Sequence, residues 1–182
     1  ISFSADEAIQ TPTVAVMLGS ASATGSVALA NTSGNDWTAT FTLASGDTEN
    51  VVAFTIDFSD TAGNAGGQAT STTDFSSVTF DKTVPIPTSL SISTDLDTPI
   101  EITLSGTDSD DNSLTFSLVS HPINGDVSTI TQTSATSATL VYTPSPGFHG
   151  TDSFTYIVND GHLDSAAASV TLNIAYPSPP TN

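Results

Sequence analysis

The sequence predicts an all-β protein made of two tandem Greek-key β-sandwiches. Apolar and polar side chains alternate along most of the chain, as they do in half-buried strands, and the periodicity of an amphipathic helix is nearly absent. Clusters of Gly, Ser, Asn and Asp separate the alternating segments at the short spacing that is typical of sandwiches and barrels. A proline-rich break near the middle then divides the 182 residues into two parts of domain size.

The first part contains short alternating segments that we predict to be strands. Val52–Phe58 is the clearest, because it places Val, Phe, Ile and Phe on one face and small or polar residues on the other. Trp37–Leu43 alternates in the same way, so Trp37 is expected in the core, although a lone Trp can also be a platform for a sugar ring. The remaining candidates are Thr13–Leu18 and Ser77–Phe80.

The second part repeats this pattern. Ser153–Val158 alternates well enough to be a central strand. Asn124-Gly125 predicts a tight hairpin, because a type I′ turn needs positive φ at both of its central residues. The other predicted strands are Pro99–Leu104, Leu114–Leu118, Thr139–Thr143 and Ala168–Ile174.

The boundary between the two parts is predicted from proline. Asp81–Pro87 holds two prolines within three residues, and proline favours an extended linker. We therefore predict a first domain over residues 1–85 and a second over residues 86–176. Residues 177–182 have linker composition as well, which leads us to expect that the chain is a piece of a longer array.

The chain is strongly acidic, with 19 Asp and Glu residues against a single basic one, Lys82, and a net charge of −18. Such a chain repels nucleic acid and anionic membranes, so neither is expected as a partner. No apolar stretch is long enough for membrane insertion, and the lack of cysteine excludes disulfides and thiolate chemistry. The acidity is explained either by solubility in a salty environment or by the binding of metal cations.

The second domain carries ordered motifs that resemble a known family. They are Asp95–Pro99, Gly106–Ser117, Pro144–Gly150, Thr151–Tyr156 and Asn159–Gly161. In this order they closely resemble the tandem cadherin-like repeats of large bacterial adhesins, and the resemblance covers residues 88–176. One departure is Leu96, where an acid is common in the family, so no ligand is expected at that position.

The first domain resembles bacterial immunoglobulin-like repeats in three segments, Phe3–Ala8, Phe54–Gly66 and Val78–Thr83. In that family a strand and a turn precede the segment that matches Ile1. The resemblance therefore implies that the first domain lacks its first strand, which would leave a sheet edge open to pairing with another chain.

Calcium is the cofactor that the acidic residues suggest. Calcium takes about six to eight oxygen ligands, and alternating acids in a loop can direct several carboxylates to one point. Asp108, Asp110 and Asn112 have that pattern, and the cadherin-like resemblance implies that acids near a domain end supply ligands. The further candidates are Asp95, Asp97, Asp152, Asp160, Asp57, Asp60 and Asp81. The alternative is that these residues simply form turns, as Asp and Asn often do.

The motifs of common enzymes are missing from the sequence. His121, His149 and His162 lie in no zinc-type spacing, and no nucleophile elbow, phosphate-binding loop or dinucleotide fingerprint is present. We therefore predict that the chain is not an enzyme.

The function expected from these features is structural. The chain would be a calcium-rigidified extender segment of a large secreted or cell-surface bacterial adhesin, with neighbouring repeat domains of the same chain as its partners. Two alternatives stay open. One is a binding module that contacts a host or cell-surface glycan or protein, and the other is an accessory domain of a secreted hydrolase.

Overall fold

The structure is a computed structural model that describes residues 1–109 and 113–177. It divides into two compact units, which we call unit 1 (Ile1–Asp81) and unit 2 (Lys82–Asn182). The described residues form strands, turns and irregular segments and contain no helix, so the predicted all-β class is confirmed. It follows that no described segment is a helix long and apolar enough to cross a membrane.

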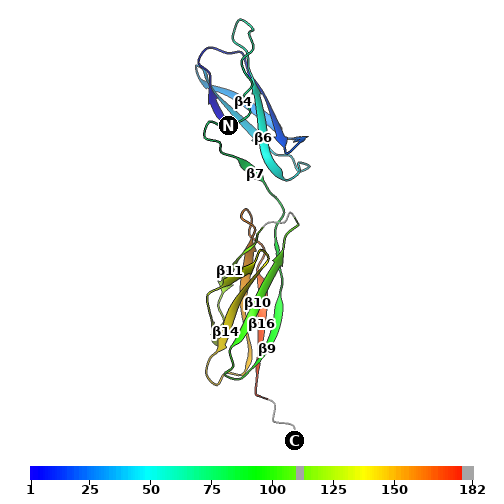
Figure 1. The fold of residues 1–182 in the computed structure, drawn as a ribbon, viewed down its shortest axis with the longest axis vertical. Helices are drawn as coiled ribbons and strands as arrows, with labels where there is room; N and C mark the ends of the chain where they lie inside the picture. The colour runs from blue at the N-terminus through cyan, green and yellow to red at the C-terminus, as the bar shows by residue number, and fades with distance from the viewer. Residues whose placement is uncertain (110–112, 178–182) are drawn as a thin grey trace. The chain divides into compact units, whose positions relative to one another are not determined.

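Unit 1 consists of two antiparallel sheets (Figure 1). The first has the order β1 (Ser2–Ser4), β5 (Asp36–Thr42), β4 (Ser26–Ser33), and the second has the order β3 (Ala21–Ser22), β2 (Thr13–Leu18), β6 (Asn50–Asp57), β7 (Val78–Phe80).

The core of unit 1 is small. Its buried hydrophobic side chains are Val16, Leu18, Ala39 and Ile56, and none of them is among the fully buried side chains of the described chain. Trp37 begins the alternating face of β5 but is only half-buried, and β5 ends before Leu43, whose side chain is exposed. Alternation therefore located β2, β5, β6 and β7 but not β4, and it overestimated how deeply the apolar face of β5 is covered.

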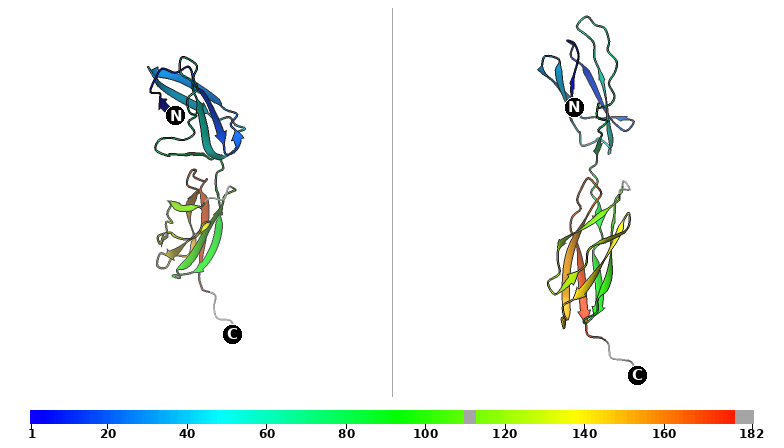
Figure 2. Two further views of the ribbon diagram at one scale, coloured as in Figure 1. Left: turned by 45° about the horizontal axis from the view of Figure 1, so that its top comes forward. Right: turned by 60° about the vertical axis from the view of Figure 1, so that its left-hand side comes forward.

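Unit 2 also consists of two sheets (Figure 2). One has the order β12 (Gly125–Val127), β14 (Ser137–Pro144), β10 (Ile100–Thr107), β8 (Ile86–Pro87), with β13 (Thr131–Ser134) also paired to β14. The other has the order β11 (Thr115–Ser120), β15 (Gly150–Asn159), β16 (Ala168–Ala175), β9 (Leu90–Asp95).

The core of unit 2 is filled from both sheets. Tyr142, Tyr156 and Phe154 are its largest fully buried side chains, and Phe116 stacks on Tyr156 with ring centroids 6.2 Å apart. Fourteen buried residues form one apolar cluster, compared with the four of unit 1. Because apolar burial is the main favourable term in folding, unit 2 is expected to be the more stable unit.

The predicted hairpin turn at Asn124-Gly125 is wrong. Gly125 begins strand β12, opposite Pro144, and does not have a positive φ. The reason for glycine is a close approach, since a Cβ at this position would lie 2.5 Å from Cε2 of Tyr142. The dipeptide that usually marks a turn therefore serves packing here.

The proline segment also differs from the predicted linker. Pro85 is fully buried, and Ile86 and Pro87 form β8, which pairs with Thr107 and Gly106 of β10. Proline is tolerated there because β8 is an edge strand. The chain then crosses to the other sheet as β9, so residues 85–87 are part of unit 2 in the structure.

Candidate functional site

Two of the predicted calcium ligands follow strands that end at the same pole of unit 2. Asp108 comes directly after β10, and Asp160 directly after β15. Gly106 and Val158 precede them by two residues and face each other across the sandwich, since a Cβ on Gly106 would lie 3.4 Å from Cγ1 of Val158. Side chains two residues apart in a strand share a face, so Asp108 and Asp160 lie at this pole. We call it the entry pole, because the chain enters unit 2 there through β8.

The loop after β15 is held by its own hydrogen bonds. The Asp160 Oδ1 atom accepts hydrogen bonds from the backbone N–H groups of His162 and Leu163, both at 2.7 Å. Gly161 permits the turn with a φ of 102°. The Asn159 Nδ2 group donates to Oδ1 of Asp164 at 2.8 Å, so the loop is closed by side chains as well.

The second oxygen of Asp160 is buried and has no hydrogen-bond partner among the described residues. The residue is 6% exposed, and its Oδ2 atom accepts no hydrogen bond from any described residue. Burying a carboxylate oxygen without a partner is costly, so buried polar atoms are nearly always paired. A cation ligated by Oδ2 would remove this cost, and the donor chemistry of Asp160 therefore fits calcium.

The predicted acidic loop is only partly visible. Asp110 and Asn112 lie outside the described residues, so Asp108 is the one member of that pattern with a described position. Within residues 1–109 and 113–177, no group of three or more His, Cys, Asp or Glu side chains gathers closely enough to hold a metal ion. The described carboxylates of the entry pole are therefore too few to form a complete calcium coordination shell by themselves.

Asp152 has a structural role at the other end of β15. Its carboxylate accepts hydrogen bonds from the backbone N–H groups of Ile123 and Asn124, at 3.1 and 2.9 Å, and from the Tyr142 hydroxyl at 3.1 Å. Burial and the neighbouring Asp152 raise the pKa of Tyr142. Eight residues separate Asp152 from Asp160, or about 26 Å of extended strand, so the two cannot bind the same ion.

Asp95 and Asp97 also lie at the pole of Asp152, which we call the exit pole. Asp95 ends β9 opposite Ala175, where the chain leaves the sheet. Asp97 has a φ of 55°, and its Oδ1 atom accepts a hydrogen bond of 2.7 Å from the N–H group of Gly147. The structure therefore separates these two acids from Asp108 and Asp160.

Two candidate ligands of unit 1, Asp57 and Asp60, accept hydrogen bonds from side chains or backbone of the same unit. The Asp60 carboxylate accepts bonds from the backbone N–H and side-chain Nδ2 of Asn64, at 2.8 and 2.6 Å, and these bonds lower the pKa of Asp60. The Asp57 Oδ1 atom accepts a bond of 2.7 Å from Nε2 of Gln68. Asp81 follows β7 as the last residue of unit 1. The Asp60 carboxylate therefore closes a turn with Asn64.

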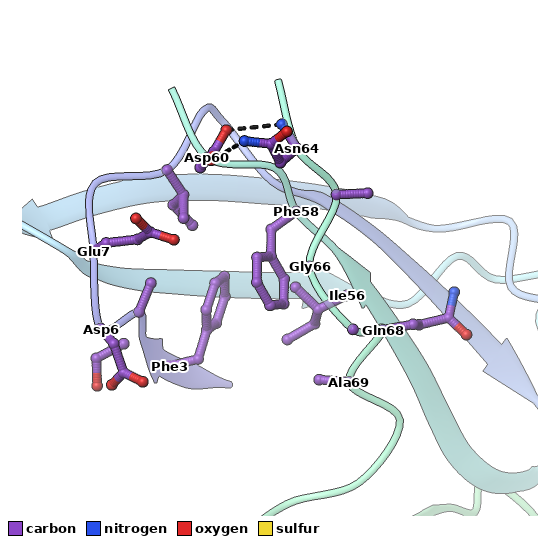
Figure 3. A pocket seen from close by; sticks show the side chains of 15 residues that line it. Phe3, Asp6, Glu7, Ile56, Phe58, Asp60, Asn64, Gly66, Gln68 and Ala69 are labelled. Carbon is purple, nitrogen blue, oxygen red and sulfur yellow. Dashed lines mark hydrogen bonds between the residues drawn. The ribbon is translucent and has the colours of Figure 1, made fainter. Parts of the chain in front are cut away.

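Unit 1 holds a pocket that sequence reasoning missed (Figure 3). Its volume is about 450 Å³, and Phe3, Ile56 and Phe58 line its apolar part. Asp6 and Glu7 line it as well, so the pocket combines an apolar floor with negative charge. The sequence shows aromatic residues in distant segments, but it does not show that they line one pocket. That becomes apparent only when the fold brings β1 and β6 together.

The comparison with protein families decides the family of the chain. Residues 81–173 match the model of the bacterial Ig domain family. The chain belongs to this family. The match falls almost entirely within unit 2 and starts at Asp81, immediately before Lys82. No curated protein resembles the chain closely enough to count as a match.

Solved structures with similar folds come from several kinds of protein. An endo-fucoidan hydrolase from glycoside hydrolase family 107 is 19% identical over 93% of the chain, with a TM-score of 0.43, and the chain spans only 24% of that protein's length. An I-band fragment from titin is 11% identical over 90% of the chain and 55% of its own, with a TM-score of 0.48. Fibronectin(III)-like modules of CbhA from Clostridium thermocellum are 14% identical over 97% of the chain and 85% of their own, with a TM-score of 0.37.

Proposed function

We propose that the chain is a non-catalytic spacer of a larger secreted or cell-surface protein. The observation that carries this proposal is the parallel pairing of β9 with β16, the first long strand and the last strand of unit 2. Because the two strands run in the same direction, the chain enters unit 2 at one pole and leaves it at the other. A domain of this kind adds its full length to whatever chain contains it.

The filled core of unit 2 supports the spacer function. Its inward-facing side chains are buried in one apolar cluster, so side chains fill the space between the two sheets. Binding sites for small molecules are concave and of substantial volume. A closed sandwich with ends at opposite poles is suited to separate other domains and not to bind a substrate.

The spacer function predicts a long and fixed distance across unit 2. The chain has no native cysteine, so spin labels can be placed on Val84→Cys and Pro177→Cys without interference. We expect one narrow distance distribution beyond about 25 Å, the length of an eight-residue strand such as β10. A pair at Pro99→Cys and Pro177→Cys, which joins two positions at the exit pole, should give a clearly shorter distance. A broad or short distribution for the first pair would contradict a rigid spacer.

Calcium at the entry pole is the second part of the proposal. We propose that Asp160, through its buried Oδ2 atom, and Asp108 are the carboxylate ligands, with carbonyl oxygens and water completing the shell. Calcium would there neutralise the buried charge and stiffen the loop after β15. This assignment leaves Asp152 to the loop it already holds by hydrogen bonds, and Asp95 and Asp97 to their turn.

Calorimetric titration with calcium tests these ligands. We expect saturable binding by the native chain and a large loss of affinity for Asp160→Asn, since a neutral amide removes one carboxylate charge. Asp152→Asn is the matched control, because it alters a buried acid of the same unit at the exit pole. If Asp160→Asn binds calcium as tightly as the native chain, Asp160 is not a ligand.

The larger protein is proposed to be a bacterial adhesin with neighbouring repeats on either side. The bacterial Ig domain family and the ordered motifs in residues 88–176 support this context. The proposed cadherin-like character of unit 2 rests on the ordered motifs alone. The accessory domain of a secreted hydrolase is the alternative context, and the spacer function would be the same in it.

The pocket of unit 1 favours a second candidate function, the binding of a peptide strand. Among the described residues, β1 is an edge strand whose single partner is β5. The backbone N–H and C=O groups of Ser2 and Ser4 point away from β5 and therefore face outward. An added strand would bond to these groups and place apolar side chains beside Phe3. Asp6 and Glu7 would favour basic residues in that strand.

A synthetic peptide in which valine and lysine alternate tests the second function. Trp37 pairs with Phe3 across β1 and β5, and it is the only tryptophan, so its fluorescence should report binding. We expect a saturable change with this peptide and none with its valine–glutamate counterpart, because the pocket is acidic. Absence of any saturable change would reject peptide binding and leave the spacer function unaffected.

A further inference from the structure

We propose that unit 2 bears tension, with β9 and β16 as a shear clamp and Tyr156 as the tie at its loaded end. This mechanical activity belongs to the same unit and deepens the spacer function. The clamp itself does not depend on the spacer function, but its use in the whole protein does. It depends on three features of the structure: the direction of the terminal strands, the shielding of their pairing, and a buried hydroxyl where the chain changes sheets.

The direction of the strands converts a pull on the chain into shear. β9 begins at Leu90, where the chain arrives from the entry pole, and β16 ends at Ala175, where it leaves at the exit pole. The two strands are parallel and adjacent, in register from Leu90 opposite Val170 to Asp95 opposite Ala175 (Figure 1). A pull on both ends of unit 2 therefore draws β9 and β16 in opposite directions along their own axes.

Shear loads the hydrogen bonds between these strands together. All six residues of β9 are in register with β16, so the bonds across this ladder must fail at nearly the same extension. If the same strands were peeled from one end, the bonds would fail one after another. The force at which unit 2 unfolds should consequently depend on the direction of pulling and not only on its stability.

The pairing of the clamp is protected on its inner side. Val170, Leu172 and Ile174 of β16 are buried in the core cluster, and Leu90 and Ile92 of β9 pack against that cluster. Water competes for backbone hydrogen bonds once they begin to open, and the apolar layer excludes it from this side of the ladder. The load-bearing bonds therefore lie beside the best-packed part of unit 2.

The Tyr156 hydroxyl ties the loaded end of the clamp to the opposite sheet. It lies close to two backbone oxygens, that of Thr88 at 2.6 Å and that of Ser105 at 2.9 Å. Thr88 is in the segment between β8 and β9, and its N–H group also donates to the Ser105 oxygen at 2.9 Å. Tension entering through β8 reaches this crossing before it reaches Leu90, so Tyr156 resists displacement of the segment that feeds β9.

Single-molecule pulling of the full chain in two directions tests the clamp. Handles on Val84→Cys and Pro177→Cys apply shear, while handles on Pro99→Cys and Pro177→Cys pull two positions at the exit pole and peel the sheets. At equal loading rate we expect the unfolding force of unit 2 to be several times higher in the first geometry. Equal forces, or a higher force in the peeling geometry, would overturn the proposal.

Two tyrosine variants separate the tie from general stability. Tyr156→Phe removes the hydroxyl beside Thr88, and Tyr142→Phe removes an equally buried hydroxyl that bonds to Asp152 outside the load path. We expect Tyr156→Phe to lower the unfolding force in shear more than in peeling, whereas Tyr142→Phe should change both alike. If the two variants reduce the shear force equally for equal losses in urea stability, Tyr156 is not a tie.

The pulling result is independent of the distance measurement. A long, narrow distance between residues 84 and 177 with equal pulling forces would keep the spacer and reject the clamp. A high shear force with a broad distance distribution would keep the clamp and reject the rigid spacer.

Discussion

Individual aspartates in this chain differ in what surrounds them, and that difference decides their roles. Asp152 accepts three backbone hydrogen bonds and one from a tyrosine hydroxyl, and Asp97 accepts one from Gly147. Asp160 instead keeps one buried oxygen without a hydrogen-bond partner among the described residues. A carboxylate already used by the fold has less capacity for a cation, so the orphaned oxygen is the better guide to a metal ligand.

Asp47 gives a prediction at the residue scale. Hydrogen bonds from the Thr24 side chain and backbone, and from the backbone of Ala44, hold the pKa of Asp47 below its ordinary 3.8. A lowered pKa means stability that is present above the ordinary value and is lost as the pH falls through the folded one. Asp47→Asn should therefore weaken unit 1 at neutral pH and match the native chain in strong acid.

Urea unfolding followed by Trp37 fluorescence at both pH values measures this effect, since Trp37 lies in unit 1. A loss of the same size at neutral and strongly acidic pH would show that the effect of Asp47→Asn does not come from ionisation.

Gly125 gives a second prediction at this scale. A Cβ there would lie 2.5 Å from Cε2 of Tyr142 and 2.7 Å from the backbone oxygen of Thr143. Gly125→Ala should destabilise unit 2 by about 1–3 kcal/mol through overpacking. Gly46→Ala is the control, because nothing lies within 4 Å of the Cβ that alanine would add there, and the φ of Gly46 is not positive. Chemical unfolding of both variants measures the difference, and equal stabilities would contradict the packing explanation.

At the scale of elements, the sequence predicts the strands whose apolar residues alternate clearly, but β4 and β9 are not among the predicted strands. The predicted strand Thr13–Leu18 has the observed bounds, and Ser153–Val158 lies within β15, which is central to its sheet. Alternation needs several residues to be recognised, so β3, β8 and β12, of two or three residues each, left no pattern. Proline at β8 led to a predicted linker and glycine at β12 to a predicted turn, and both predictions were wrong. At β8 the edge position, and at β12 the close packing, overrides the preference of these residues for loops and turns.

The candidate site could be predicted only in outline. Sequence spacing drew attention to Asp160 and Asp152 equally, since each flanks the same strand. The strand direction then puts them at opposite poles of unit 2, and only the hydrogen bonds distinguish the satisfied carboxylate from the orphaned one. Neither property is encoded in local sequence, because both depend on partners from distant segments.

Leu172 tests the contribution of the central strands. It is fully buried in β16, between β15 and β9. Leu172→Ala should lower the free energy of unfolding of unit 2 by about 2–5 kcal/mol, which combines lost burial with a cavity. Val119→Ala, at a position 56% exposed in β11, should change it by no more than about 0.5 kcal/mol. Urea unfolding followed by tyrosine fluorescence measures both, and similar losses would contradict the assigned core.

At the scale of the whole molecule, two units with unequal cores share one chain. The single tryptophan, Trp37, lies in unit 1, and all three tyrosines, Tyr142, Tyr156 and Tyr176, lie in unit 2. Because unit 2 has the larger buried cluster, we expect two thermal transitions, with tryptophan fluorescence changing at the lower temperature. Coincident transitions, or a tyrosine transition that comes first, would contradict this order.

The central claim is that unit 2 is a spacer stabilised by calcium at its entry pole, and its thermal transition tests that claim most directly. A ligand that binds only the native state stabilises it by about 2.7 kcal/mol at a concentration one hundred times its dissociation constant. Tyrosine fluorescence should therefore show a higher melting temperature in calcium than in chelator for the native chain and for Asp152→Asn, with no such shift for Asp160→Asn. Equal melting temperatures of the native chain in calcium and in chelator would contradict the claim.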